Sequence, residues 1–401
     1  MATKKGAIAA YNAARASIED PAIRKALPVG TDSNISDVSA AVLSYVPVQN
    51  AFMNAIVNKF YLQLIEAKSF NNPLRILKKG RAPLGYNIEE IHVNPVKGQA
   101  YNATATSLLS QTPPDAVSAY YTISRSKQYT LTVDRKDLRH GFTSWEALGN
   151  MFDANVNALY SGCYIDEYRA FLRLMSTAPE ANKMISQSVT APTNEATGKA
   201  LVKTLRSLHS KFRFPSVRFN TYSVQAAAAS IEDAVPRETW TNPEDIVLII
   251  PADTSAVVDV EVLAAAFNMS KADFLAANVL EIDSFDDVEA PYGSQASNIV
   301  AIIADNAWFK IFDNYMEVEP FRNPQTKSTN YYLDVEQTIG GSPFANAVAL
   351  CRPWTYALTT EAPPDWSTNW KAYYTESGGV YTKVTAATAP EWEASTYYRR
   401  Q

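Results

Sequence analysis

The residues of this chain that could carry out chemistry are few and far apart. The sequence has three histidines, His92, His140 and His209, and none has a partner at the spacing of a metal-binding motif. It contains no HExxH, CxxC, GxxxxGK[ST], GxGxxG or GxSxG motif. We therefore expect no catalytic residue, no cofactor and no metal, and we predict that the protein is not an enzyme.

The acidic run EIDSFDDVE at residues 281–289 is a possible exception. Carboxylates such as Asp283 and Asp286 could form an unrecognised active site or hold a hard cation, which prefers several oxygen ligands. Their spacing does not follow the alternating ligands of a calcium-binding loop, and a solvated loop is the simpler interpretation.

A basic cluster lies in the segment NNPLRILKKGRAPLGYNIEEIHVNPV, residues 71–96. Lys78, Lys79 and Arg81 separate the apolar LRIL from the strand-like YNIEEIHV, in a chain whose formal charge is −5. These cations are either solvated or in contact with another subunit. The acidic balance of the whole chain argues against a bulk basic field for nucleic acid.

The basic cluster is followed by a long, weakly apolar stretch. YNIEEIHV and YYTISRSKQYTLTVD have the β-branched and aromatic residues of strands, and the connection between them contains Pro95, Gly98, Pro113 and Pro114. A connection of this length inside a compact domain is typical of a functional or partner-bound loop.

Helical spacing predicts the elements around this loop. Residues 143–178 follow a capping box at Thr143 and Glu146, and a helix of about 34 residues would be a strut of roughly 50 Å. Residues 50–66 and GKALVKTLRSLHSKF predict two further amphipathic helices. Residues 1–35 are small and polar, and we expect them to order only against a partner.

Residues 245–350 alternate strands and helices, which predicts an α+β domain with its own core. The expected strands are DIVLII, VLEID, NIVAIIA, FKIF and YYLDVEQT, and the expected helices are VEVLAAAF and SKADFLAA. After Trp354 the chain becomes rich in Trp, Tyr and Thr, which suggests a small β-rich module. Its Trp366, Trp370 and Trp392 form either a small core or a platform for stacking on glycans.

Cysteine usage and hydropathy indicate a cytosolic product. Cys163 and Cys351 are too few for a disulfide framework, and we expect both to be reduced and buried. We find neither a secretory signal nor an apolar run long enough to span a bilayer.

Four collinear stretches carry a resemblance to a known family: NNPLRILKKGRAPLGYNIEEI, DVEVLAAAFNMSKADFLAANVLEIDSF, WFKIFDNYMEVEPFRNPQTKSTNYYLDVEQ and FANAVAL. They lie at 71–91, 259–285, 308–337 and 344–350, and together they span most of residues 34–351. The sequence resembles the major capsid protein of short-tailed bacteriophages of the Salasvirus (picovirus) group. The resemblance implies the α+β Hong Kong 97-type capsid fold, here with a small β-rich C-terminal extension.

The resemblance also assigns parts of that fold to the chain. It implies an N-terminal arm (1–35), a helical segment of the peripheral region (36–83), an extended loop over a neighbouring subunit (84–135), a spine helix with the peripheral domain (136–244), an axial domain (245–345), a return strand (346–358) and the aromatic-rich module (359–401). About 48 residues follow Pro353, too few for the immunoglobulin-like domain of known members, which takes roughly 100.

The implied function is a structural subunit that self-assembles into an icosahedral head around double-stranded DNA. Its partners would be itself in hexamers and pentamers, scaffolding and portal proteins, and packaged DNA without sequence specificity, with no membrane. It would be found in the virion capsid after assembly in the host cytoplasm. The candidate inter-subunit contacts are Lys78, Lys79, Arg81, Lys97, Arg125 and Lys127. The alternatives are a carbohydrate-binding or decoration role for the C-terminal module, or an unrecognised enzyme.

Overall fold

The structure is a computed structural model, and it describes most of the chain. The described residues are 4–44, 46–52, 55, 70–82, 87–98, 113–133, 142–227, 235–258, 278–285, 298–323, 325–326, 328–353, 356–358, 373–377, 380–383, 390–393 and 396–400. The chain forms two compact units, which are described separately. Unit 1 comprises Met1–Ile88, Tyr120–Ala170 and Ile311–Gly340, and unit 2 comprises Glu89–Ala119, Phe171–Lys310 and Gly341–Gln401.

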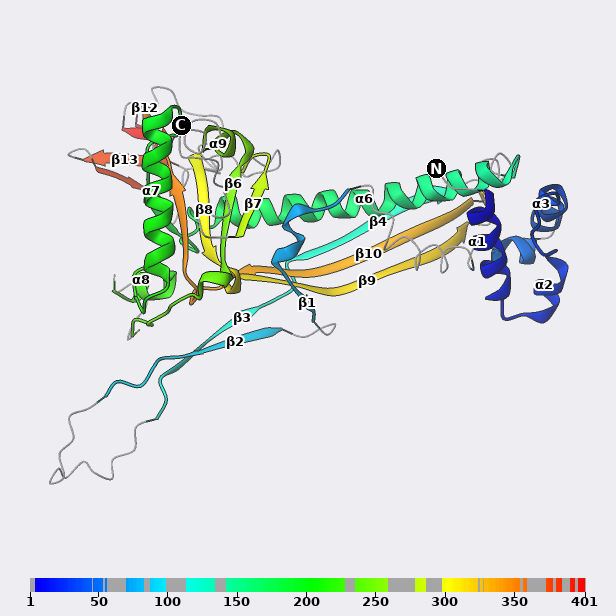
Figure 1. Ribbon diagram of the computed structural model, residues 1–401, viewed down its shortest axis with the longest axis horizontal. Helices are drawn as coiled ribbons and strands as arrows, with labels where there is room; N and C mark the ends of the chain where they lie inside the picture. The colour runs from blue at the N-terminus through cyan, green and yellow to red at the C-terminus, as the bar shows by residue number, and fades with distance from the viewer. Residues whose placement is uncertain are drawn as a thin grey trace, which may run out of the picture. The chain divides into compact units, whose positions relative to one another are not determined.

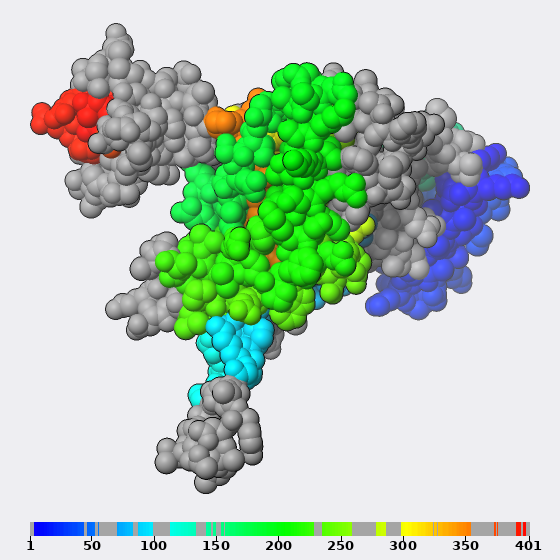
Figure 2. All heavy atoms as spheres, turned by 60° about the vertical axis from the view of Figure 1, so that its left-hand side comes forward, coloured from blue at the N-terminus to red at the C-terminus, as the bar shows by residue number. Residues whose placement is uncertain are grey.

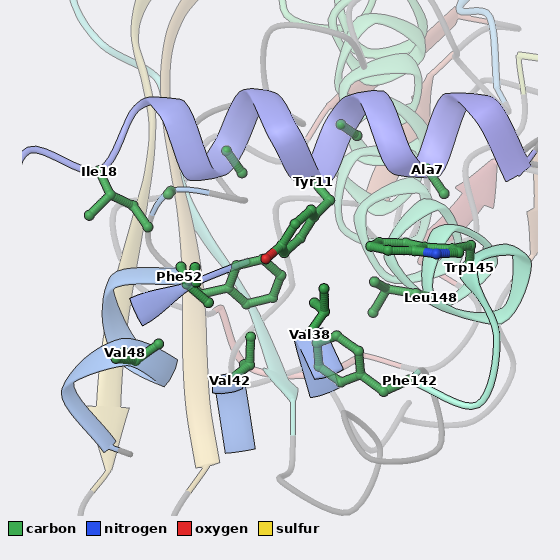
Figure 3. Packing of buried hydrophobic residues seen from close by; sticks show 14 of the residues in the cluster. Ala7, Tyr11, Ile18, Val38, Val42, Val48, Phe52, Phe142, Trp145 and Leu148 are labelled. Atoms are coloured by element: carbon green, nitrogen blue, oxygen red, sulfur yellow. The ribbon is translucent and has the colours of Figure 1, made fainter. Parts of the chain in front are cut away.

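The N-terminal residues fold onto their own subunit. Helices α1 (Lys4–Ala16), α2 (Pro21–Ala26) and α3 (Ile35–Ser44) contribute to one buried apolar cluster of unit 1. Figure 3 shows Tyr11 of α1 in this cluster, with its ring centroid 5.5 Å from that of Phe52 and 5.3 Å from that of Trp145. The expectation that this segment orders only against a partner is therefore wrong for residues 4–35. Its alanines pack closely on one helix face and need little apolar bulk.

The predicted long helix is present as α6 (Trp145–Thr177), with 33 residues. Its cap differs by one position from the prediction, because the Ala147 N–H donates to Ser144 Oγ at 3.0 Å and Thr143 lies outside the cap. Along α6, Leu159 and Cys163 pack against apolar residues of strand β10. The helix is thus fixed along unit 1 by an apolar stripe.

A sheet of four strands in unit 1 has the order β1-β9-β10-β4. Its strands are β1 (Lys78–Arg81), β9 (Phe309–Asn323), β10 (Ser328–Gly341) and β4 (Arg125–Val133), and the short helix η1 (Pro73–Leu77) precedes β1. β1 runs parallel to β9, and β4 runs antiparallel to β10 (Figure 1). β9 and β10 belong to the 245–345 stretch, which was predicted to form one domain with its own core. In the structure they pair in the unit 1 sheet and not with the other strands of that stretch.

Unit 2 is built on a sheet of order β5-β11-β8-β6-β7. Its strands are β5 (Ile185–Ser188), β11 (Ala347–Cys351), β8 (Ile299–Asp305), β6 (Ile246–Pro251) and β7 (Asn278–Ile282). Every residue of β6 is buried, as its continuous apolar sequence predicts. Helix α7 (Glu195–Phe212) packs its apolar face on this sheet (Figure 1), and α8 (Thr221–Ala227), η2 (Pro243–Asp245), α9 (Ala252–Val257) and η6 (Asn306–Trp308) complete the described helices.

The extended loop contains a two-stranded sheet of β2 (Ile88–Val93) and β3 (Ala116–Tyr121). The predicted second strand is divided in the structure, because β3 ends at Tyr121 and β4 begins at Arg125 and pairs with β10. We call β2, β3 and the adjoining described residues 94–98 and 113–115 the ribbon. Its described residues are cyan in Figure 2 and lie against the green surface of unit 2.

The C-terminal residues form a sheet of order β12-β15-β13-β14, as the β-rich prediction requires. Its strands are β12 (Tyr356–Leu358), β15 (Tyr397–Arg400), β13 (Tyr373–Ser377) and β14 (Val380–Lys383). β12 pairs with β15, whereas β11 ends at Cys351, so residues 356–358 belong to the C-terminal sheet.

Several predictions fall outside the described residues. These are most of the helix at 50–66, the helices VEVLAAAF and SKADFLAA, and the single residues His140, Asp286, Trp366 and Trp370. No helix within the described ranges is long and apolar enough to cross a membrane.

Candidate inter-subunit surfaces

Two of the six candidate contact residues lie inside unit 1. Lys78 has a side chain that is 14% exposed, and its Nζ pairs with the carboxylates of Glu167 and, at 2.9 Å, Asp313. Arg125 is 7% exposed, and its guanidinium donates to the Tyr129 hydroxyl at 2.6 Å. Both cations are therefore engaged within the subunit.

These two cations belong to one buried polar network. Gln337 Nε2 donates to Glu167 Oε1 and to Asp313 Oδ1, both at 2.7 Å, and Gln337 Oε1 accepts from Arg125. Asn72 Nδ2 donates to the second carboxylate oxygen of Glu167 at 3.1 Å. The network joins the long helix α6 to all four strands of the unit 1 sheet and to the segment before β1. Lys78 is paired with the carboxylates of Glu167 and Asp313, and Arg125 is hydrogen-bonded to neutral groups, as burial requires.

Burial also shifts the titration of two groups beside Arg125. It raises the pKa of the Tyr129 hydroxyl and the pKa of the Cys163 thiol, and the nearby Arg125 charge opposes both shifts. The Cys163 backbone carbonyl accepts from Arg125 Nη2 at 3.1 Å. At neutral pH the phenol and the thiol are therefore protonated, and Arg125 keeps neutral partners at this end of the network.

The other four candidate cations, Lys79, Arg81, Lys97 and Lys127, are exposed. Lys79 and Arg81 flank Gly80, whose φ of +112° is a left-handed conformation that favours glycine. The prediction that these four residues contact a neighbouring subunit stays a prediction.

Three apolar side chains in and after β2 point outward from the ribbon. Ile91 is 62% exposed, Val93 is 50% exposed and Val96 is 87% exposed. The alternate residues Glu90 and His92 are partly buried. A strand at the surface of a monomer ordinarily turns its apolar face to the core and its polar face to water. Residues 90–93 of β2 do the reverse, with Ile91 and Val93 exposed and Glu90 and His92 partly buried.

The inward face of the ribbon carries shifted titratable groups. Burial lowers the pKa of His92 below its ordinary value of 6.5, and the Arg237 charge lowers it further, while Glu90 acts in the opposite direction. Hydrogen bonds from Arg237 and Asn94 lower the pKa of the Asp115 carboxyl. Neither Arg237 nor Asp115 was among the candidates from the sequence. The alternation of Glu90, His92 and Asn94 with apolar residues is the signal that could have pointed to this face.

The two remaining described candidates, Trp392 and Asp283, are not brought together with other candidate residues. Trp392 is half-buried, and its ring centroid lies 5.3 Å from that of Tyr397, which favours a small core over a glycan platform. Asp283 is exposed. Within the described ranges, no group of three His, Cys, Asp or Glu side chains is placed to hold a metal ion.

Comparisons of sequence identify relatives. A profile of the Phi29-like phage major capsid protein family matches residues 11–351. The chain is 32% identical to the major capsid protein of Bacillus phage PZA over 330 residues, which cover 81% of this chain and 68% of the relative. It is 29% identical to the major capsid protein of Bacillus phage B103 over 327 residues, again 81% of this chain and 68% of the relative.

Comparisons of structure find the same fold at low sequence identity. A capsid structure of Staphylococcus phage Andhra aligns with a TM-score of 0.54 and 15% identity, covering 71% of this chain and 85% of that one. A structure of the head fiber and inner core protein gp22 of bacteriophage P68 aligns with a TM-score of 0.53 and 16% identity over the same shares. The predicted α+β capsid fold of the Hong Kong 97 type is confirmed. With a profile match over most of its length, this chain belongs to the Phi29-like phage major capsid protein family.

Proposed function

We propose that many copies of this chain assemble, as hexamers and pentamers, into the icosahedral shell that encloses a phage's double-stranded DNA. Family membership and the capsid fold support a structural, non-enzymatic role in a virion. Scaffolding and portal proteins are the proposed assembly partners, and the host cytoplasm is the proposed place of assembly. The carbohydrate-binding and enzymatic alternatives have no support from the relatives named above.

The single observation that carries the assembly proposal is the outward apolar surface formed by β2 and the residues just after it. Ile91 and Val93 of β2, and Val96 beyond its end, are at least half exposed, and exposed apolar strands favour pairing or association with other chains. The opposite, polar face is engaged by the subunit's own residues, so the ribbon cannot bury its apolar face by turning over. We therefore propose that the apolar face packs on a neighbouring copy of this chain.

Electrostatics supports the same arrangement for the exposed cations. Lys79, Arg81, Lys97 and Lys127 are carried by a chain whose formal charge is −5, so a neighbouring copy offers more carboxylates than cations. Charge pairs of this kind at the rim of an interface guide the encounter and fix its register more than they add affinity. The acidic balance of the chain also leaves the proposed contact with packaged DNA weak and non-specific.

Assembly of ribbon variants tests the proposal. The full-length chain is expressed with the scaffold of its phage, and shells are counted by negative-stain microscopy. We expect the double variant Ile91→Asp, Val93→Asp to remain soluble and folded by circular dichroism but to form no shells. Val224→Asp is the matched control, because Val224 is 43% exposed on α8, outside the ribbon. Shells from the ribbon variant at the wild-type yield would refute the role of this face.

A further inference from the structure

The inward face of the ribbon is fastened to unit 2 at successive alternate positions of β2. Glu90 accepts a hydrogen bond from Ser342 Oγ at 2.9 Å and pairs with Lys310 Nζ at 2.9 Å. The next inward residue, His92, stacks on Phe344 with ring centroids 5.4 Å apart and an interplanar angle of 18°. Polar and aromatic contacts therefore hold β2 where apolar packing would ordinarily do so.

The third inward residue, Asn94, meets the opposite side of the ribbon and the body of unit 2 together. Its Nδ2 donates to Asp115 Oδ2 at 3.1 Å and to the Pro236 carbonyl at 3.2 Å, and its Oδ1 accepts from the Glu238 N–H at 3.2 Å. Arg237 Nη2 donates to Asp115 Oδ1 at 2.7 Å, and Nη1 donates to the Asp115 carbonyl at 2.8 Å. We call Asn94, Asp115 and Arg237 the ribbon clamp.

The body side of the clamp is rigidly built. The Arg237 side chain is 2% exposed, whereas that of Asp115 is 46% exposed. The Arg237 N–H donates to Ser223 Oγ at 2.7 Å, and its carbonyl accepts from Ser223 Oγ at 2.8 Å and from Asn220 Nδ2 at 3.0 Å. The guanidinium also lies over the Tyr222 ring, 5.8 Å from its centroid. Helix α8 thus holds a buried cation in a fixed position for a carboxylate on the ribbon.

The clamp lies where one set of contacts acts on both strands of the ribbon. It ties the residue after β2 to the residue before β3, at the point where the chain leaves the two-stranded sheet. A two-point contact between a guanidinium and one residue fixes an angle as well as a distance. Loss of that contact would let the polar face lift from unit 2, and the apolar face would then no longer point in one direction.

We propose that Arg237 is a positioning residue for assembly, which acts through Asp115 and Asn94 to hold the ribbon's apolar face toward the neighbouring copy. This inference rests on the proposed shell function and adds to it the residues that fix the orientation of the contact surface. A pre-positioned surface binds better because less conformational freedom is lost on association.

Asp115→Ala in the full-length chain is the decisive variant, because Asp115 is on the exposed side of the clamp and its removal leaves no cavity in the core. The control is Glu244→Ala, another exposed carboxylate of unit 2 that lies outside the ribbon. Hydrogen exchange of the unassembled chain is read at the Asn94 and Glu238 amides, which donate to Asp115 and Asn94. We expect exchange about tenfold faster or more in Asp115→Ala, slower initial shell formation and unchanged circular dichroism. Asp115→Asn keeps an acceptor oxygen, so we expect it to fall between wild type and Asp115→Ala.

The two readouts separate this proposal from the one on which it rests. Equal exchange in Asp115→Ala and wild type would overturn the clamp itself. Faster exchange with shells forming at the wild-type rate would overturn its positioning role. A wild-type chain that forms no shells with its scaffold would overturn the shell function, and the assembly half of this proposal with it, while the exchange measurement would still report on the clamp.

Discussion

Replacing Glu167 by glutamine should destabilise unit 1 without leaving a cavity. Glu167 is 2% exposed, and both of its carboxylate oxygens accept hydrogen bonds in the polar network. In the Glu167→Gln variant, the side-chain amide would place an NH2 group against a donor, either that of Asn72 or those of Lys78 and Gln337. The Lys78 cation would lose its more buried partner and keep Asp313.

The contacts of Lys78 set limits on how much the free energy of unfolding should fall in the Glu167→Gln variant. Removing one member of a buried ion pair costs about 3–5 kcal/mol, because the other charge stays buried. Lys78 keeps one carboxylate at 2.9 Å, which places the expected loss at the lower end, about 3 kcal/mol. That is a large fraction of the free energy of unfolding of a typical domain, which is roughly 5–15 kcal/mol.

The matched control is Asp166→Asn on the same helix. Asp166 has a side chain that is 35% exposed, and it accepts one hydrogen bond from the Tyr129 hydroxyl at 2.9 Å. An asparagine can still accept that bond, so we expect a loss below about 1 kcal/mol. Urea unfolding of the unassembled chain, followed by circular dichroism, measures both variants.

The reasoning would be refuted if Glu167→Gln and Asp166→Asn lost equal stability. A second check is the double variant Lys78→Met, Glu167→Gln. Because it removes the orphaned cation, it should lose less stability than the sum of the single variants, by about 1–3 kcal/mol. A purely additive result would mean that Lys78 and Glu167 do not act as a pair.

Three further perturbations have defined outcomes. Gly341→Ala would place a Cβ in steric conflict with the buried Trp308 ring, so it should lower the free energy of unfolding measured in urea by about 1–3 kcal/mol, whereas Gly98→Ala, with nothing within 4 Å, should be neutral. Because the folded-state pKa of His92 is lowered, the detached ribbon binds a proton more readily than the docked ribbon, and the ribbon should loosen as pH falls below about 6.5. Hydrogen exchange in the ribbon, compared at pH 7 and pH 5.5, should show this loosening in wild type. In His92→Phe the part of the pH dependence that is due to His92 should be absent. A chain ending at Pro353 lacks the C-terminal sheet and should still form shells with scaffold, and a soluble truncated chain that forms none would place that sheet in a subunit interface.

Elements with strong local periodicity could be predicted from the sequence. The 33 residues of α6 repeat apolar side chains every three or four positions, and β6 and β8 are short runs of β-branched residues. These patterns depend on neighbours along the chain, so they need no knowledge of the fold. The pairing of β9 with β1 joins Ile311 to Lys78, and no local pattern encodes a contact so distant.

The interior position of Lys78 and Arg125 was unpredictable for the same reason. Their carboxylate and amide partners lie on other elements, up to 212 residues away in the case of Arg125 and Gln337. One local signal was present, since Glu167 continues the four-residue spacing of Leu159 and Cys163. A carboxylate within an apolar helical stripe indicates a buried partner of opposite charge.

The burial of both cysteines makes the native chain slow to react with thiol reagents. Cys163 is 3% exposed and Cys351 is 1% exposed, and they are the two cysteines of the sequence. Alkylation requires an accessible thiolate, so a maleimide should label the folded protein slowly and the unfolded protein at two positions. A cysteine introduced at Val96, which is 87% exposed, would then be the single fast-reacting site, and a dye attached there would report the docking of the ribbon in real time.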